Sequence, residues 1–220
     1  MAGNAPAHLY VVAGANGAGK SSIAGAMVRE SGADYFNPDE AAHRIRSANP
    51  HLTQEAANSA AWHEGTRLLR RAIAERLHFA IETTLGGRTI TALLADAASN
   101  GAQVHLWYAG LASPELHIAR VQERVRRGGH AIPDEAIRGR FDSSRLNLIR
   151  LLPALAELRL YDNSTEANPR DGAAPQPVLL LHTSRGAIVT MQALKDIPAW
   201  AKPIVGAALR VANAPSAARP

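Results

Sequence analysis

The sequence predicts an α/β protein in which a mainly parallel sheet lies between two layers of helices. Short apolar runs alternate with longer stretches of helix-forming composition along most of the 220 residues, which is the pattern of strand–helix–strand units. Hydrophobic residues make up 46% of the chain. This is enough to cover both faces of such a sheet, and it argues against global disorder.

The expected strands are short apolar runs that stop at glycine, proline or polar residues. They lie at 8–14, 34–37, 79–84, 102–110, 158–164 and 177–184. The expected helices are rich in Ala, Leu, Arg and Glu, and some carry a capping residue, such as Thr53 and Ser113 at their starts and Gly101 at an end. They lie at 19–31, 38–46, 53–78, 88–101, 113–129, 133–156 and 191–212, the last broken by prolines.

The chain reads as one large domain with an extension. We expect residues 1–163 to form the core, with a helical lid at about 114–147 inside it. Residues 164–210 are expected to add a strand and helices to the same domain, and 211–220 to form a disordered tail. The polar, proline-containing stretch at 165–177 is the best internal hinge.

Composition narrows the class of protein. The chain has no Cys, which excludes disulfides and cysteine zinc sites and fits a reducing, cytoplasmic location. Its formal charge of +5 and pI of about 10.1 suggest polyanionic ligands, but aromatics make up only 5%. We therefore favour a concentrated anion pocket and consider a nucleic-acid partner unlikely. The sequence shows no signal peptide or bilayer-spanning run, so we expect no membrane partner, and its histidines show no metal-binding spacing.

The strongest motif follows the first expected strand. The stretch GANGAGKS fits the phosphate-loop pattern G-x-x-x-x-G-K-[ST]. Glycines let the backbone curl so that its N–H groups point inward, and the following helix adds positive potential. Lys20 is predicted to reach the β- and γ-phosphates, and the Ser21 hydroxyl to bind Mg²⁺. The predicted ligands of a nucleoside triphosphate are Gly14, Ala15, Asn16, Gly17, Ala18, Gly19, Lys20, Ser21 and Ser22.

Two carboxylates follow other expected strands. Because ligands bind at the carboxyl ends of parallel strands, Asp39 and Glu82 are expected near the phosphate loop. Asp39 is a candidate general base for an acceptor hydroxyl or a metal ligand, although an acid here equally favours a helix N-terminus. Glu82 and Thr84 suit a hydroxylated ligand, and Arg88 is a candidate phosphate ligand. The alternative is a polar strand-to-helix turn.

A pair of basic helices predicts a lid. Gly128–Gly129 separates two arginine-bearing helices, and in the first of them the arginines share one face. The arginines of the pair are Arg120, Arg124, Arg127, Arg138, Arg140 and Arg145. Closing such a lid would bring guanidinium groups to the γ-phosphate and exclude water. The alternative is an exposed helix pair with a solvated basic face.

Together these blocks resemble the zeta-toxin family of P-loop kinases, and more narrowly its short bacterial branch of zeta-like ATPases or kinases. The blocks are GANGAGKSS, FNPDEAA, FAIETTLGGR, RVQERVRRGGHAIP and LRLYDNS, which occur in that order within residues 8–163. The resemblance implies a three-layer P-loop kinase fold that uses ATP and Mg²⁺. It also implies phosphorylation of a nucleotide sugar such as UDP-N-acetylglucosamine at a sugar hydroxyl, and control by an antitoxin protein.

By this resemblance the catalytic residues are Lys20, Asp39, Arg120 and Arg124. Asp39 takes the position of the catalytic base, and Glu82 and Thr84 match strand-end residues near the acceptor. The sequence departs from the family around the base, where the signature D-G/N-D-x-F-R is NPDEAAHR here. Two other functions stay open: an ATPase or nucleotide-dependent switch that uses water, and a polynucleotide 5′-kinase or nucleic-acid-binding protein.

Overall fold

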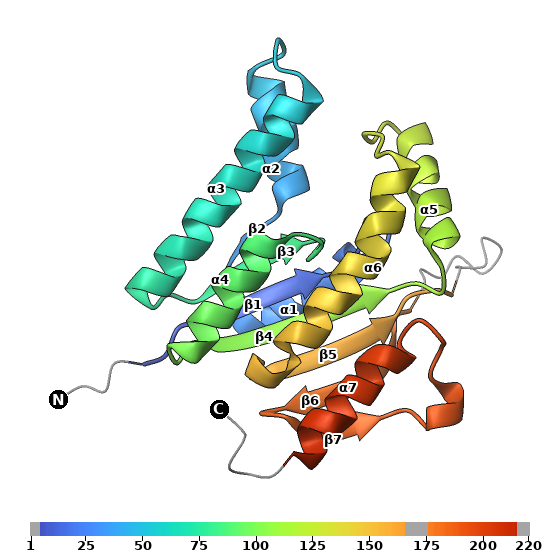
Figure 1. Cartoon of the computed structure of the whole chain (residues 1–220). Helices are drawn as coiled ribbons and strands as arrows, with labels where there is room; N and C mark the ends of the chain where they lie inside the picture. The colour runs from blue at the N-terminus through green and yellow to red at the C-terminus, as the bar shows by residue number, and fades with distance from the viewer. Residues whose placement is uncertain (1–4, 166–175, 215–220) are drawn as a thin grey trace.

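The computed structural model describes residues 5–165 and 176–214, and its centre is one seven-stranded sheet (Figure 1). The strand order is β2-β3-β1-β4-β5-β6-β7. The first five strands in this order are parallel, and β6 and β7 are antiparallel to their neighbours. The strands are β1 His8–Ala13, β2 Asp34–Phe36, β3 Phe79–Thr83, β4 Gln103–Gly110, β5 Glu157–Asp162, β6 Val178–Ser184 and β7 Ala187–Met191. The predicted α/β fold with a mainly parallel sheet is confirmed.

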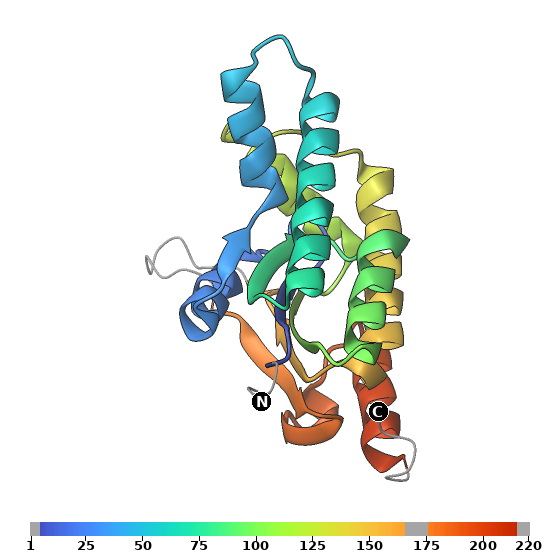
Figure 2. The ribbon, with the colours of Figure 1, turned by 90° about the vertical axis from the view of Figure 1, so that its left-hand side faces the viewer.

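Seven α-helices are present among the described residues, and they cover the sheet unequally (Figure 2). They are α1 Ser21–Ser31, α2 Pro38–Ala48, α3 Gln54–Glu75, α4 Arg88–Ser99, α5 Pro114–Arg126, α6 Asp134–Leu151 and α7 Lys202–Asn213. Helix α1 lies on one face, where Ile23 and Met27 pack against Val12 and Trp107. Helices α3, α4, α6 and α7 cover the other face and enclose the larger core, which includes Leu9.

Two helix pairs rise beyond the carboxyl ends of the parallel strands, as Figure 1 shows. One pair is α2 and α3, which pack along each other. The other is α5 and α6, joined through a small apolar cluster of Ile118, Val121 and Ile137. The segment expected to form a lid is therefore a packed helix pair that faces the α2–α3 hairpin, and its movement as a lid stays a prediction.

Local capping residues set the starts of these helices. The Asn37 side chain accepts hydrogen bonds from the N–H groups of Asp39 and Glu40, and Pro38 occupies the first turn of α2. Thr53 caps α3 and Ser113 caps α5, as the sequence predicted. These caps fix where the two raised helix pairs leave the sheet.

The C-terminal part differs from expectation in one strand. The stretch Ala187–Met191 was not predicted as a strand, yet it forms β7 and pairs with β6 in a hairpin. Arg185 and Gly186 make the turn with positive φ angles of 47° and 74°, and the β-branched run that follows suits a strand. Helix α7 continues to Asn213. Most of the predicted hinge falls in residues 166–175, which lie outside the described residues. Residues 215–220 also lie outside them.

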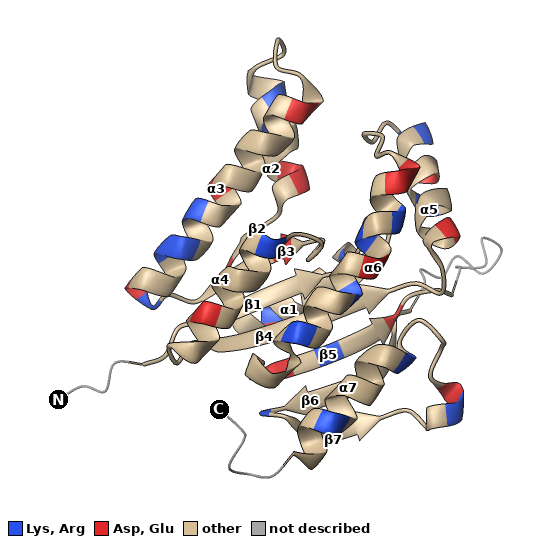
Figure 3. Ribbon diagram, viewed as in Figure 1, with Lys and Arg blue, Asp and Glu red and all other residues tan. Residues whose placement is uncertain are grey.

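Charge is distributed over the surface. Figure 3 shows Lys and Arg on α3, α4, α6 and α7, with Asp and Glu between them. Any anion site must therefore depend on local groups, not on one strongly basic face. None of the helices in the described ranges is both long enough and apolar enough to cross a bilayer.

Candidate functional site

The phosphate loop between β1 and α1 has a backbone that only glycine can follow. Gly14, Gly17 and Gly19 have φ angles of 144°, 82° and 76°. A Cβ atom on Gly14 would lie 2.2 Å from the carbonyl oxygen of Ala109, and one on Gly17 would lie 2.5 Å from that of His117. The glycine spacing of the motif is therefore a requirement of both the conformation and the close packing.

The loop leads into a helix end that is open to an anion. Among the described residues no side chain caps the N-terminus of α1, and its first turn carries no acid. Lys20 folds back across the loop, and its Nζ atom donates to the carbonyl oxygen of Gly14 over 3.1 Å. A helix N-terminus without a side-chain cap and a nearby ammonium group together suit a triphosphate.

A magnesium ion would depend mainly on the nucleotide for its ligands. Within the described ranges no group of three or more His, Cys, Asp or Glu side chains could hold a metal. Ser21, the first residue of α1, is exposed and offers one hydroxyl. Because Mg²⁺ in nucleotide sites keeps phosphate oxygens and waters as ligands, a single protein hydroxyl is compatible with this role.

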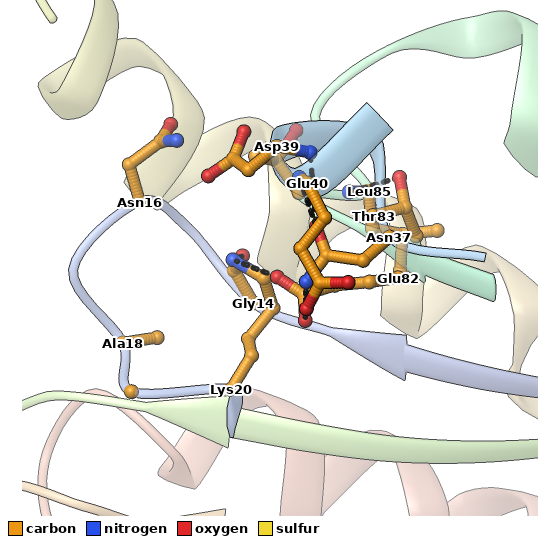
Figure 4. A network of polar contacts seen from close by, with 12 residues as sticks. Gly14, Asn16, Ala18, Lys20, Asn37, Asp39, Glu40, Glu82, Thr83 and Leu85 are labelled. Atoms are coloured by element: carbon orange, nitrogen blue, oxygen red, sulfur yellow. Dashed lines mark hydrogen bonds and ion pairs between the residues drawn. The ribbon is translucent and has the colours of Figure 1, made fainter. Parts of the chain in front are cut away.

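Glu82 lies beside Lys20 at the end of β3. Its Oε1 atom is 3.6 Å from the Lys20 Nζ, and both side chains are largely buried. Its Oε2 atom accepts hydrogen bonds from the Tyr35 hydroxyl over 2.8 Å and from the Asn37 amide over 3.4 Å. Figure 4 shows Lys20, Asn37 and Glu82 close together beside the phosphate loop. These partners offset the cost of burying the carboxylate, and burial and Glu82 both raise the pKa of Tyr35 so that it remains a donor.

Asp39 stands above this network on the first turn of α2, with its carboxylate directed toward the side of Asn16 in Figure 4. Its Oδ2 atom is 3.4 Å from Nη1 of Arg124, which belongs to α5. Arg124 also donates to the carbonyl oxygen of His130 over 3.5 Å. The Asp39–Arg124 pair joins the α2–α3 hairpin to the α5–α6 helix pair across the top of the site.

A cavity of about 360 Å³ lies between these elements. Its lining brings together many of the residues predicted from the sequence, namely Asn16, Lys20, Asp39, Glu82 and Thr84. Other lining residues come from α3, from the start of α4 and from the turn between α5 and α6. Asp39 and Arg124 also border a second hollow with His130.

Two predicted residues lie elsewhere in the described structure. Arg88 begins α4, is exposed and is not part of the cavity lining as the described residues define it. Arg120 directs a guanidinium nitrogen to the carbonyl oxygen of Thr165, 3.3 Å away, and is also outside that lining. Neither side chain is thus brought together with Lys20, Asp39 and Glu82 in this conformation.

Three further residues hold the phosphate loop. The sequence analysis named Arg140 only as one arginine of the basic helix pair, and it did not single out the other two. Arg140 of α6 lines the cavity, and its Nη1 atom donates to the Oδ1 atom of Asn16 over 2.7 Å. His117 of α5 is buried, and its Nδ1 atom lies 2.7 Å from the Asn16 carbonyl oxygen. Burial lowers the pKa of His117 to about 4, so the ring is neutral and Nδ1 carries the proton it donates.

Asn163 follows β5 and is the third of these residues. Its Nδ2 atom donates to the Ala18 carbonyl oxygen over 2.9 Å and lies 3.4 Å from the Ser22 hydroxyl. Its Oδ1 atom is buried and has no hydrogen-bond partner in the part of the chain that the structure describes. The sequence block LRLYDNS contains Asn163. Its contact with Ala18 joins residues that are far apart in the sequence, so no local spacing predicts it.

A family model described as an AAA domain matches residues 9–144, which is more than half of the chain. The chain belongs to this family. The AAA domain begins in β1 and ends in α6, so it contains the phosphate loop and both walls of the cavity. An uncharacterized protein of Haemophilus influenzae is 32% identical over 128 residues, which cover 58% of this chain and 88% of that protein.

Solved structures share the fold of this AAA domain at low sequence identity. The complex AvrRxo1-ORF1:-ORF2 with ATP matches with a TM-score of 0.65 and 14% identity over 93% of this chain. The chain spans 64% of that protein's length. The PezAT toxin–antitoxin system of Streptococcus pneumoniae matches with a TM-score of 0.53 and 15% identity, over 97% of this chain and 88% of that one. The fold is therefore of the P-loop kinase type.

Proposed function

We propose that the protein is an ATP-dependent kinase of the zeta-toxin type. It transfers the γ-phosphoryl group of ATP to a hydroxyl of a nucleotide sugar such as UDP-N-acetylglucosamine, with Mg²⁺ as cofactor. One observation carries the proposal: Lys20, Asp39 and Glu82 line the same cavity directly beside the phosphate loop. Phosphoryl transfer requires a phosphate-binding loop, a carboxylate that can act as a base, and space for a second molecule.

Each residue has a defined task in this reaction. Lys20 and the loop N–H groups hold the β- and γ-phosphates, and Mg²⁺ supplies further positive charge when it is bound through Ser21. Asp39 accepts the proton of the acceptor hydroxyl, whose oxygen then bonds to the γ-phosphorus. The bond from that phosphorus to the bridging oxygen breaks, and ADP leaves.

The arginines of the lid act on the transferring group. Arg140 contacts the phosphate loop at Asn16 and Arg124 contacts Asp39, and their guanidinium groups are suited to stabilise charge on the phosphoryl group as it moves. Arg120 can join them only if α5 moves. Glu82 orients Lys20, and Thr84 lies in the lining where the acceptor would bind.

The cavity also favours a kinase over an enzyme that uses water as the nucleophile. A hydrolytic switch needs space for one water beside the γ-phosphate, whereas a cavity of about 360 Å³ is in the size range of small-molecule sites. The likeness of the fold to PezAT adds the proposal that a small antitoxin protein binds this chain.

The test is incubation of the full chain with ATP, Mg²⁺ and a panel of nucleotide sugars, followed by mass spectrometry for an added phosphate. Asp39→Asn should abolish transfer while the dissociation constant for ATP stays within about twofold, because the carboxylate acts on the acceptor. Glu55→Gln is the matched control, since it removes one acid from the first turn of α3. ATP consumption that no acceptor stimulates, or full transfer by Asp39→Asn, would refute the proposal.

A further inference from the structure

The cavity lining combines a few charged residues with a larger set of neutral ones. Four lining residues carry a formal charge, and each has a partner near the phosphate loop. Lys20 lies 3.6 Å from Glu82, Asp39 lies 3.4 Å from Arg124, and Arg140 lies 2.7 Å from Asn16. Apart from His130, the other described lining residues are neutral. They are Asn16, Asn37, Pro38, Asn58, Trp62, Gly65, Thr66, Ile81, Thr83, Thr84, Gly87, Thr89, Ile90, Ala131, Ile132 and Pro133.

One wall of the cavity is a single face of α3 whose lining residues carry no formal charge. Asn58, Trp62 and Thr66 recur at four-residue spacing, so they lie one above another along the helix. Gly65 lies on the same side, and a Cβ atom there would come within 2.7 Å of the Phe36 ring. The glycine thus lets α3 approach β2 closely, which sets the position of this wall over the end of the sheet.

Trp62 stands out among the three tryptophans. Trp107 and Trp200 are 3% and 4% exposed and belong to the core, whereas Trp62 is 43% exposed. Its indole packs edge-on against His63, with the ring centroids 4.9 Å apart. A large, partly apolar ring that is left uncovered beside threonine hydroxyls and an asparagine amide is a surface suited to a ligand ring.

We infer that Trp62 is the platform on which the acceptor's ring stacks, and that the part of the acceptor inside the cavity is an uncharged, hydroxylated ring. This inference rests on the proposed function and specifies its acceptor site. The apolar face of a sugar or nucleoside ring covers the indole, and hydroxyls of Thr84 and Thr89 and the Asn58 amide offer hydrogen bonds at its rim. Because the α3 wall carries no formal charge among its lining residues, any phosphate that the acceptor carries lies away from this wall.

The first measurement is tryptophan fluorescence, because Trp107 and Trp200 are buried in the core and a bound ligand can cover only Trp62. Emission from Trp62 should change when a ring covers it, so the full chain with ADP and Mg²⁺ is titrated with UDP-N-acetylglucosamine, N-acetylglucosamine and adenosine in turn. Calorimetry gives the dissociation constant of each, and the transfer assay gives KM. Trp62→Ala should raise the acceptor's dissociation constant and KM about tenfold and leave that of ADP unchanged. Trp62→Phe should recover most of the loss, because it restores an aromatic face.

Leu52→Ala is the matched control, since Leu52 is 38% exposed on the same hairpin and lies outside the cavity lining of the described residues. It should behave like the parent. Binding through Trp62 without transfer would refute the kinase and retain the ring site. Transfer with an unchanged KM in Trp62→Ala would refute the ring site and retain the kinase. If none of the three compounds binds, the ring site is likewise refuted.

Discussion

Arg140 donates to the Asn16 side chain over 2.7 Å and so ties helix α6 to the phosphate loop. His117 holds the backbone of the same residue from helix α5. Asn16 is therefore a point at which both α5 and α6 contact the loop. The position of this helix pair and the shape of the phosphate loop are linked at this residue through two hydrogen bonds of different chemistry.

Replacing Arg140 should affect turnover more than stability. Arg140→Ala removes a guanidinium group from the cavity, and we expect kcat for phosphoryl transfer to fall about a hundredfold, as for loss of one charge-stabilising donor. Arg138→Ala is the matched control on the same helix, because Arg138 is exposed and pairs with Glu115 at the surface. The measurement is steady-state kinetics. If kcat of Arg140→Ala stayed within about threefold of the parent, Arg140 would only support the phosphate loop.

Gly19 should tolerate no side chain. Its φ of 76° disfavours any L-residue, and a Cβ atom would lie 2.2 Å from the Asn163 Nδ2 atom. Gly19→Ala should therefore weaken ATP binding by about ten- to a hundredfold in calorimetry. Adding Asn163→Ala removes the clash but not the backbone strain, so it should restore only part of the affinity.

Gly139→Ala provides the comparison for Gly19→Ala. Gly139 lies within α6, and a Cβ atom there would meet no atom within 4 Å among the described residues. This change should leave ATP affinity unaltered and slightly raise the free energy of unfolding, because alanine favours a helix. If both variants lost ATP affinity equally, the loss in Gly19→Ala could not be assigned to the geometry of the phosphate loop.

The sequence predicted those parts of the site whose geometry is local. Gly14, Gly17 and Gly19 act through their own dihedral angles, so their spacing alone identifies the loop. The presence of Asp39 and Glu82 in one cavity lining was predictable as well, because Asp39 follows β2 and Glu82 lies near the end of β3, and the carboxyl ends of parallel strands meet at one edge of the sheet. The strand–helix alternation that defined the fold is equally a property of short stretches.

The remaining contacts depend on how distant segments pack. Arg140 and Asn16 are 124 positions apart, and Asn163 and Ala18 are 145 apart, so no spacing could link them. The basic face of α5 illustrates the same limit: its arginines were treated as equivalent, yet Arg124 reaches Asp39 while Arg120 points to Thr165. The rotation of α5 on the fold decides this difference, and the apolar contacts of Ile118 and Val121 with Ile137 set that rotation.

His117 should make the protein sensitive to mild acid. Burial lowers its pKa from 6.5 to about 4, so between these pH values the unfolded chain binds more protons than the folded one. The free energy of unfolding should therefore fall as the pH drops from 6.5 to 4, by on the order of 3 kcal/mol. Urea titrations across this range should show that His117→Phe removes most of the slope. Parallel pH profiles for parent and variant would contradict this assignment.

Glu157 should act at lower pH through a separate network on the sheet. Its oxygens lie 3.1 Å from Nδ1 of His105, 2.8 Å from Nε of Arg159 and 3.0 Å from Nε2 of His182. The hydrogen bond from His105, followed by Arg159, lowers the pKa of Glu157 to about 2. A lowered carboxyl pKa stabilises the folded state above pH 4.5, and this contribution is lost as the pH falls toward 2.

The expected contribution of Glu157 is about 2 kcal/mol, less than the full pKa difference implies because water reaches the site. Glu157→Gln should lower the free energy of unfolding at pH 7 by this amount and flatten the acid limb below pH 4.5. It should leave the contribution of His117 between pH 6.5 and 4 unchanged, so that the double variant His117→Phe/Glu157→Gln loses both contributions. Because Glu157 lies on β5 beyond the cavity lining of the described residues, ATP affinity at pH 7 should stay unchanged. A loss of affinity would instead show that this network extends to the phosphate loop.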